Sequence, residues 1–366
     1  MISPSFKGGG DEAQLNVIIA DTFRADHLGC YGNDWIKTPN LDQLASEGVT
    51  FKNCYADGLP TIPARRVYFT GKSIIPMEVH GGWIPLRNND VTLPQILRKH
   101  GYTTAFITDT WHYFKPGMNF HRGFDQWTWV RGQESDRYLT GPVVSDEVVA
   151  RHIPEGLKGR QRLWEFLRRY LTNNAYRVNE SDYYPARVFT EAARWITDNH
   201  DAERFFLVVD SFDPHEPWDP PAPYDTMYAD PNYRGKKLIH PKHGPVDWMS
   251  EEELRNVRAL YAGEVTFVDE CLGILLGTLK ELGLYENTLI IVIADHGHPH
   301  GDHGWIMKHD HNLYNELLRI PLLIRRPDGR FAGTTCDALV QPQDILPTIL
   351  EFLDVPIPDT VQALSL

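Results

Sequence analysis

Two short apolar segments far apart in the sequence are each followed directly by residues that can bind a metal ion. Asp21 follows residues 16–20, and Asp295 and His296 follow residues 289–294. If both segments are parallel strands of one sheet, their carboxyl ends meet at one edge and the three side chains converge. Two carboxylates and an imidazole suit Ca²⁺, Mg²⁺ or Mn²⁺ and do not exclude Zn²⁺. Taken alone, each aspartate is better explained as a cap or turn residue, but the pair of strand-end positions favours a metal site.

Thr61 stands at the start of a predicted helix, where its hydroxyl has either a structural or a chemical role. Pro63 is favoured in the first turn of a helix, and Thr61 can cap that turn. Capping is the structural alternative. The free N–H groups and positive potential of a helix N-terminus, together with Arg65, would instead hold an anion and a hydroxyl that attacks it.

The elements that must position these residues alternate along the chain. Apolar runs that end in a polar or acidic residue predict buried parallel strands over residues 16–20, 102–108, 205–209 and 289–294. Helical patterns cover residues 40–47, 93–100 and 250–282, and Ser250 and Glu253 have capping-box spacing. Alternating strands and helices predict a doubly wound α/β sheet, whose ligands bind beyond the carboxyl ends of its strands.

Composition limits the class of protein. The chain has 366 residues, of which 42% are hydrophobic, and this is enough for one large core. Its net charge of −13 argues against a general nucleic-acid binder but not against a local basic pocket for an anion. Two stretches, about 115–190 and 214–245, are polar, aromatic and irregular, so they are expected to be loop insertions over the site.

Cysteine spacing and hydropathy predict a cytoplasmic protein without a disulfide framework. Cys30, Cys54, Cys271 and Cys336 are widely spaced and form no C-x-x-C pair, so reduced thiols are expected and a thiolate zinc site is not. Residues 1–14 contain no apolar stretch typical of a signal peptide, and no run of about 18 apolar residues occurs. Neither a membrane nor a nucleic acid is therefore expected as a partner.

The motifs around these residues are highly specific when taken together. They are D-T-F-R-A-D-H-L-G-C-Y-G at 21–32, K-T-P-N-L-D at 37–42, T-I-P-A-R at 61–65, T-G-K at 70–72, A-D-H-G at 294–297 and G-D-H-G at 301–304, followed by Lys308 and residues 314–323. The combination resembles the sulfatase family of the alkaline phosphatase superfamily. The resemblance implies an alkaline-phosphatase-like three-layer α/β/α fold with a large, mostly parallel central sheet, and a catalytic domain over residues 15–366. Family members usually continue into a smaller C-terminal subdomain, which is expected to be largely absent or truncated here.

The resemblance also implies a role for each residue of the site. Metal ligation is implied for Asp21, Asp295, His296 and the nucleophile Thr61. Stabilisation of the anion is implied for Arg65, Lys308, His112 and His215; His112 follows Trp111, and His215 lies in D-P-H-E-P at 213–217. Thr110 replaces a family lysine and is expected, with Arg65 and Lys308, to bind substrate.

Threonine at position 61 is the departure from the family that decides most about mechanism. The family has a cysteine or serine there that becomes formylglycine. Threonine cannot be oxidised to that aldehyde, so no formylglycine is expected. A threonine alkoxide next to a metal ion is, however, a competent nucleophile for phosphoryl transfer.

Other departures bear on the number of metal ions. Thr22 replaces a frequent second metal aspartate, and a histidine-rich run could hold a second ion or only form a loop: His298, His300, His303, His309 and His311. A retained Lys308 occupies the role of a second metal, so one divalent ion is favoured. In the two-metal alternative, the ligands would be His215 with some of His300, His303, His309 or Asp213.

These observations predict a metal-dependent hydrolase of sulfatase type with Thr61 as nucleophile. It would cleave a small anionic ester, either a phosphate (diester or phosphonate) or a sulfate ester; a homo-oligomer is left open. The nearest alternative is a sulfatase proper that works with an unmodified threonine or carries threonine in place of a native cysteine. A catalytically weak protein that retains the anion site is a further class, and a phosphomutase of the same superfamily is less favoured.

Overall fold

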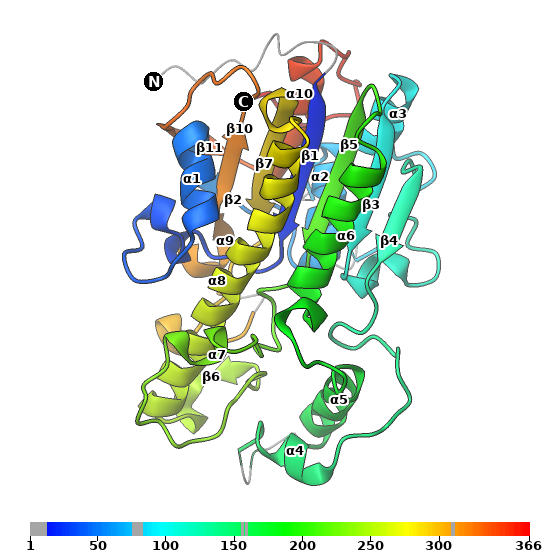
Figure 1. Ribbon diagram of the computed structural model, residues 1–366. Helices are drawn as coiled ribbons and strands as arrows, with labels where there is room; N and C mark the ends of the chain where they lie inside the picture. The colour runs from blue at the N-terminus through cyan, green and yellow to red at the C-terminus, as the bar shows by residue number, and fades with distance from the viewer. Residues whose placement is uncertain (1–12, 75–82, 155–156, 158–159, 309–311) are drawn as a thin grey trace.

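A large sheet forms the centre of the computed structural model, which describes residues 13–74, 83–154, 157, 160–308 and 312–366 (Figure 1). Within these residues the sheet has nine strands in the order β11-β2-β10-β7-β1-β5-β3-β4, and β9 pairs with β2. Most neighbours are parallel, whereas β10 runs antiparallel to β2 and β7. The predicted α/β fold with a large, mostly parallel central sheet is confirmed.

The predicted strands and helices are present, and their ends differ from the predictions by at most two residues. The main sheet contains β1 (Gln14–Ala20), β2 (Val49–Tyr55), β3 (Thr103–Thr108), β4 (Gln126–Trp129), β5 (Phe205–Ser211), β7 (Thr288–Ala294), β9 (Arg319–Ile320), β10 (Leu322–Arg325) and β11 (Thr334–Val340). A small sheet pairs β6 (Gly244–Pro245) with β8 (Trp305–Ile306). The helices are α1 (Pro39–Glu47), α2 (Thr61–Thr70), α3 (Leu93–Lys99), α4 (Asp146–Ala150), α5 (Arg160–Asn173), α6 (Tyr184–Asp198), α7 (Tyr224–Met227), α8 (Glu251–Glu281), α9 (Asn315–Leu318) and α10 (Ile345–Phe352).

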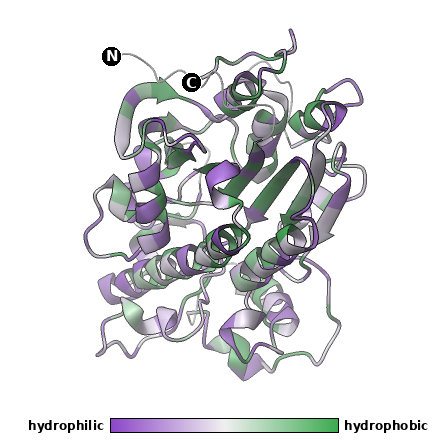
Figure 2. Ribbon diagram, turned by 45° about the horizontal axis from the view of Figure 1, so that its top comes forward, coloured by the Kyte–Doolittle hydropathy of each residue, from purple (hydrophilic) through white to green (hydrophobic). Residues whose placement is uncertain are grey.

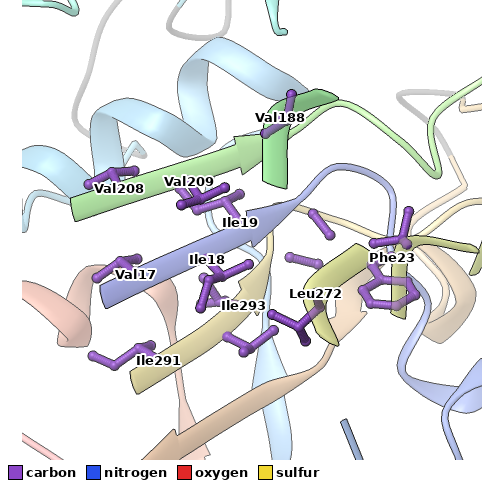
Figure 3. Packing of buried hydrophobic residues seen from close by; sticks show 14 of the residues in the cluster. Val17, Ile18, Ile19, Phe23, Val188, Val208, Val209, Leu272, Ile291 and Ile293 are labelled. Atoms are coloured by element: carbon purple, nitrogen blue, oxygen red, sulfur yellow. The ribbon is translucent and has the colours of Figure 1, made fainter. Parts of the chain in front are cut away.

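The central strand β1 is buried along its whole length. It lies between β5 and β7 and is parallel to both. Figure 3 shows Val17, Ile18 and Ile19 of β1 among side chains such as Val208 of β5 and Ile291 of β7. A strand covered on both faces needs apolar residues at every position, which explains why β1 reads as a continuous apolar run in the sequence.

The register of the three central strands brings their carboxyl ends to the same level. Ala20, the last residue of β1, pairs with Ser211 of β5 and with Ala294 of β7. The next residues along β1 and β7 are Asp21 and Asp295. These two aspartates therefore leave the sheet side by side, as the sequence predicts.

Helices cover both faces of the sheet. α6 and α8 lie side by side over one face, and α2 lies behind the sheet, where it packs with α3 and α10 (Figure 1). Figure 2 shows hydrophobic strands in the middle and hydrophilic residues on the outer sides of the helices. The predicted capping box begins α8, because Ser250 Oγ accepts from the Glu253 amide at 3.1 Å and Glu253 accepts from the Ser250 amide at 2.8 Å.

The two expected insertions differ in their content. The stretch 214–245 is mostly irregular and contains only the short α7 and β6 among regular elements that the structure describes there. The stretch 115–190, expected to be loops, instead contains β4, α4, α5 and the start of α6. β4 extends the sheet by pairing parallel with β3, but its edge position leaves residues such as Gln126 exposed. An exposed edge strand lacks a continuous apolar run, which explains why β4 was not recognised in the sequence. The prediction of loops over 115–190 was wrong for β4 and for the helices α4, α5 and α6.

The sequence predicts reduced cysteines and no membrane-spanning segment. Cys30, Cys54, Cys271 and Cys336 are free. Among the residues placed by the structure, none of the helices combines the length and the apolar character needed to span a membrane. The cytoplasmic location and the domain limits 15–366 stay predictions.

Candidate active site

The carboxyl ends of β1 and β7 carry a buried cluster of potential metal ligands. One ligand atom each of Asp21, Asp295 and His296 lies within 4.8 Å of the others. All three side chains are fully buried. The parallel register of the two strands produces this convergence, so the structure brings together the three residues that the sequence singles out.

His296 presents an unprotonated nitrogen at this cluster. Its Nδ1 lies 2.7 Å from the carbonyl oxygen of Gly297, and because a carbonyl can only accept, Nδ1 carries the proton. Nε2 is left with a lone pair, and no group in the described parts of the chain hydrogen-bonds to it. Burial lowers the pKa of His296 to about 4, so the ring is neutral at pH 7. A backbone carbonyl that fixes the tautomer in this way is typical of metal-binding histidines.

The two aspartates hold negative charge that protein groups compensate only in part. Neither oxygen of Asp21 accepts an aligned hydrogen bond from any described residue, although Oδ2 lies 3.0 Å from Arg65 Nη1. Burial and then the Asp295 carboxylate raise the pKa of Asp21 well above its usual range. For Asp295 burial acts in the same direction, but Arg65 and His296 outweigh it and lower the pKa. A divalent cation would balance both carboxylates and be coordinated by the free oxygens and nitrogen, so these residues fit a metal ion.

Arg65 of α2 is the positive side chain beside these carboxylates. It is fully buried and donates to Asp210 twice, from Nε to Oδ2 at 3.1 Å and from Nη2 to Oδ1 at 2.9 Å. Its Nη1 contacts Asp295 and Asp21. The guanidinium therefore contacts three carboxylates but offsets only one negative charge, and its predicted contact with the substrate anion stays a prediction.

Thr61 is the first residue of α2 and not its cap. The N-cap is Pro60, whose backbone is extended (φ −85°, ψ −160°). Its side chain makes no capping hydrogen bond. The capping alternative for Thr61 is therefore wrong, although Pro63 does lie in the first turn. Thr61 is buried and precedes Arg65 by four residues. Because side chains at i and i+4 share a helix face, Thr61 lies on the face from which Arg65 reaches Asp21.

One known protein family matches a range of the chain that includes both Asp21 and Asp295. Residues 15–355 match the family described as Sulfatase. The chain belongs to the sulfatase family. Sulfatases are members of the alkaline phosphatase superfamily, as the motifs indicate, and the relatives and structural neighbours of this chain are ester hydrolases. The chain is accordingly an ester hydrolase of sulfatase type.

Individual relatives of this sulfatase-family chain are described for different esters. PehA of Trinickia caryophylli, a multifunctional alkaline phosphatase superfamily protein, is 29% identical over 92% of this chain and 73% of its own length. An arylsulfatase of Clostridium perfringens is 28% identical over 96% of this chain and 76% of its own length. The phosphonate monoester hydrolase of Agrobacterium radiobacter has a TM-score of 0.72 at 23% identity, over 97% of this chain and 76% of that one. Because the sequence identity is only 23%, the similarity to the phosphonate monoester hydrolase shows a shared fold and nothing more.

Lys308 and His215, both expected in the sulfatase site, are in direct contact. The Lys308 ammonium lies against Nε2 of His215 and 3.7 Å from Oε1 of Glu216. His215 donates its Nδ1 proton to the Glu216 carbonyl at 2.7 Å, so Nε2 carries the lone pair that Lys308 meets. Burial, assisted by the Lys308 charge, holds the pKa of His215 well below its usual range. A neutral His215 thus fixes the position of the Lys308 cation.

His112 and His215 both contact the ring of Phe212. The ring centroid of Phe212 is 6.1 Å from that of His112 and 4.0 Å from that of His215. Glu134 orients His112 through a contact of 2.9 Å with Nε2 and also accepts from Trp111 at 2.6 Å. Sequence reasoning missed Glu134, because it lies in the stretch expected to be irregular and no motif marks it.

Thr110, expected to bind substrate, is fully buried, and its hydroxyl donates to Asp210 at 3.2 Å. Asp210 also receives hydrogen bonds from Arg65 and from the Tyr113 hydroxyl. Its role in gathering these side chains was missed. Asp210 follows a predicted strand, which marks it as a candidate site residue. Asp109 also follows a predicted strand, and the sequence does not show which of the two aspartates contacts Arg65.

Thr22, where the family often has a second metal aspartate, has a strained backbone. Its φ of 57° is rare for a β-branched residue. Its amide donates to Asp295 at 2.9 Å, and Tyr261 donates to its carbonyl at 2.7 Å. The buried hydroxyl finds no hydrogen-bond partner within the described ranges. Backbone strain of about 1–3 kcal/mol persists only where surrounding contacts enforce it. The hydrogen bonds of Thr22 to Asp295 and Tyr261 hold this conformation beside the site.

The histidine-rich run does not converge on one point. His298 and His300 are buried, with ring centroids 4.8 Å apart, whereas His303 is exposed and stacks on Tyr314 at 3.7 Å. His309 and His311 lie outside the described residues. Among the residues that are described, neither cluster of potential metal ligands contains His300, His303 or Asp213.

Proposed function

We propose that this chain hydrolyses a phosphodiester or a phosphonate monoester, with the Thr61 hydroxyl as nucleophile and one divalent ion held by Asp21, Asp295 and His296. The position of Thr61 carries the proposal. It is buried at the start of α2, one turn before the guanidinium that contacts both carboxylates of the metal cluster. When bound, such an ion lowers the pKa of an adjacent hydroxyl and offsets charge on the ester oxygens.

The preference for phosphorus over sulfur rests on the side chain at position 61. Threonine cannot become formylglycine, so the attacking atom is the hydroxyl oxygen itself. Its attack on phosphorus breaks the P–O bond to the alcohol, which leaves with the proton of the hydroxyl. Water then cleaves the phosphoryl or phosphonyl ester on Thr61 and restores the hydroxyl. The relative PehA is described as a multifunctional member of the superfamily, so more than one class of ester should be assayed with this chain.

Lys308, His112 and Arg65 are expected to assist this reaction, each in a different way. Lys308, oriented by His215, supplies a fixed ammonium. His112 is oriented by Glu134 through Nε2, and its buried Nδ1 has no partner among the groups that the structure describes. With the proton on Nε2, this nitrogen carries a lone pair and can accept a hydrogen bond from a water molecule or a substrate hydroxyl. Arg65 keeps the two metal-binding carboxylates in place and reduces their repulsion.

Hydrolysis of a sulfate ester by the same residues is the second candidate. It is supported by relatives such as the arylsulfatase of Clostridium perfringens and the N-acetylglucosamine-6-O-sulfatase of Bacteroides thetaiotaomicron, which is 27% identical over 95% of this chain and 69% of its own length. Sulfate and phosphate esters share a tetrahedral, anionic centre, so the same cations would bind either one.

An activity panel decides between these candidates. Purified protein is stripped of metal and then assayed with Mg²⁺, Mn²⁺, Ca²⁺ or Zn²⁺ against an aryl phosphodiester, phosphonate monoester, phosphate monoester and sulfate. The proposal expects metal-dependent turnover of the phosphodiester or phosphonate that is lost in Thr61→Ala. Turnover of the sulfate alone would favour the second candidate. Metal binding without turnover of any ester would identify a binding protein and contradict both.

A further inference from the structure

A second group of potential metal ligands lies beside Lys308, outside the Asp21 cluster. One ligand atom each of Glu216, His240 and His243 lies within 4.8 Å of the others. We propose that these three residues bind a second divalent ion of the Zn²⁺ type and that His298, which contacts Glu216 but lies outside this group, is recruited as a fourth ligand. This site shares no ligand with the Asp21 cluster, and its existence does not depend on which ester is cleaved.

The histidines of this group have the tautomer that metal binding requires. Each donates its Nδ1 proton to a backbone carbonyl, at 3.2 Å in His240, 3.4 Å in His243 and 3.0 Å in His298. Because a carbonyl only accepts, each ring is left with a lone pair on Nε2. The same arrangement is found at His296 in the first cluster. Backbone carbonyls thus prepare three imidazoles to act as ligands.

Glu216 is a buried carboxylate with one oxygen that lacks a hydrogen bond. The residue is 2% exposed, and its Oε2 has no hydrogen-bond partner in the part of the chain that is described. Oε2 lies 3.2 Å from His298 Nε2. With the His298 proton on Nδ1, two lone pairs face each other, which is unfavourable unless a cation is shared between them. Ligands of a tetrahedral zinc ion with bonds of about 2.0–2.2 Å are separated by about 3.4 Å, so the observed spacing fits.

The two ends of the insertion at 214–245 build this site. Glu216 stands near its start, and His240 and His243 stand near its end. Pairing of β6 with β8 places Gly244 opposite Ile306, which holds this end of the insertion close to the segment that leads to Lys308. A shared ion would fasten both ends of the insertion beside the active site and offset the entropy cost of closing this loop.

Ligand type separates the second site from the first. Two imidazoles and a glutamate are a common zinc set, whereas the two carboxylates of the Asp21 cluster also suit Mg²⁺, Mn²⁺ or Ca²⁺. The Lys308 ammonium, 3.7 Å from Glu216 Oε1, opposes a cation at the second site. Removal of this ammonium should therefore tighten Zn²⁺ binding there.

The test is calorimetric titration of Zn²⁺ into metal-free, untagged full-length protein. The background variant is Asp21→Asn, in which the first cluster lacks a carboxylate. One equivalent of Zn²⁺ should still bind, and adding His243→Ala or Glu216→Gln should weaken this binding by at least about tenfold. His200→Ala, which removes an exposed histidine elsewhere, is the matched control and should change nothing. Adding Lys308→Ala should strengthen the binding.

Thermal unfolding supplies a second readout that is independent of turnover. Zn²⁺ should raise the Tm of Asp21→Asn but not of Asp21→Asn/His243→Ala. His243 is exposed, so its alanine variant is expected to fold even if Glu216→Gln does not. The proposal is overturned if Asp21→Asn binds no Zn²⁺, or if His243→Ala binds it as tightly as its parent. Glu216 and His298 would then form an ion pair with a protonated imidazole.

Discussion

Asp210 accepts two hydrogen bonds from Arg65, 2.9 and 3.1 Å long, through the two guanidinium nitrogens that do not contact Asp21. This fork fixes the plane of the guanidinium, since a bidentate pair allows little rotation. The third nitrogen, Nη1, is thereby directed at Asp21 and Asp295. Asp210 positions Arg65 for the metal cluster although it is not itself one of the proposed ligands.

Asp210→Asn should therefore lower both stability and kcat/KM. Loss of one partner of a buried ion pair costs about 3–5 kcal/mol, which denaturant unfolding would measure. Asp90→Asn is the matched control, because Asp90 pairs at 3.1 Å with Arg66, the next residue of α2, in a buried pair that does not involve the cluster. The control should lose stability and keep metal affinity and kcat/KM. Unchanged kcat/KM in Asp210→Asn would refute the positioning role.

Asp295→Asn should remove most of the metal affinity of the first cluster. A neutral amide replaces a carboxylate on a cation that needs charge compensation, and Asp21 then faces the ion with one fewer negative group. Elemental analysis after dialysis against Mg²⁺ or Mn²⁺ measures the change. Asp26→Asn, at a half-exposed aspartate paired with Arg24, is the control and should keep its metal. Equal metal content in both variants would refute the assignment.

Thr61→Ala should abolish turnover while Thr61→Ser retains it, because serine keeps the hydroxyl at the same position. Thr61 makes no capping hydrogen bond with the residues that the structure describes, so alanine should cost less than the roughly 0.5–2 kcal/mol typical of a lost N-cap. Single-turnover kinetics and denaturant unfolding test the two statements. Near-normal turnover in the alanine variant would mean that another group attacks the ester.

The convergence of Asp21 and Asp295 could be predicted from sequence because the end of each strand is marked locally. Buried parallel strands read as apolar runs, and the first polar residue after each run marks the end of the strand, as at Asp21 and Asp295. The fold then supplies the register. The start of α2 was predicted less well, since Thr61 and Pro60 both precede Pro63 and only the backbone angles show which of them begins the helix.

Other partners in the site, unlike Asp210, could not be predicted, because they come from segments with no periodic signal. Glu134 lies in a region without a motif, and it reaches His112 only through the tertiary fold. His240 and Glu216 come together because an irregular insertion turns back on itself. A chain segment without apolar periodicity has no pattern from which its path can be inferred.

The stability of the protein should depend on pH through Asp109. Burial raises the pKa of this carboxyl to about 7, from 3.8, and Gln133 joins it to Asp213, whose pKa is also raised. Between these pH values the folded state binds a proton that the unfolded state has released. The free energy of unfolding should therefore decrease as pH rises from about 4 to about 7. Asp109→Asn should flatten this slope in denaturant unfolding, and exposed Asp201→Asn should not.

Lys308→Ala gives the most informative test of how the site works, because it separates catalysis from metal binding. In the proposed mechanism the ammonium contacts an ester oxygen in the transition state, so its loss should lower kcat by two or more decades, a contact worth on the order of 3 kcal/mol. Metal content of the Asp21 cluster should not change, since Lys308 is not one of its ligands. Lys280→Ala, at a lysine that lies over Tyr285, is the control and should retain full activity.

The same variant also tests the contact with His215. His215 faces Lys308 through its Nε2 lone pair, so His215→Ala should lower kcat in the same direction, and the double variant should lose little more than Lys308→Ala alone. Additive losses would mean that His215 acts on the substrate by itself. An unimpaired Lys308→Ala would mean that a metal ion, and not the ammonium, stabilises the ester oxygen. That result would contradict the one-ion mechanism while leaving Zn²⁺ binding at Glu216 to be judged by its own titration.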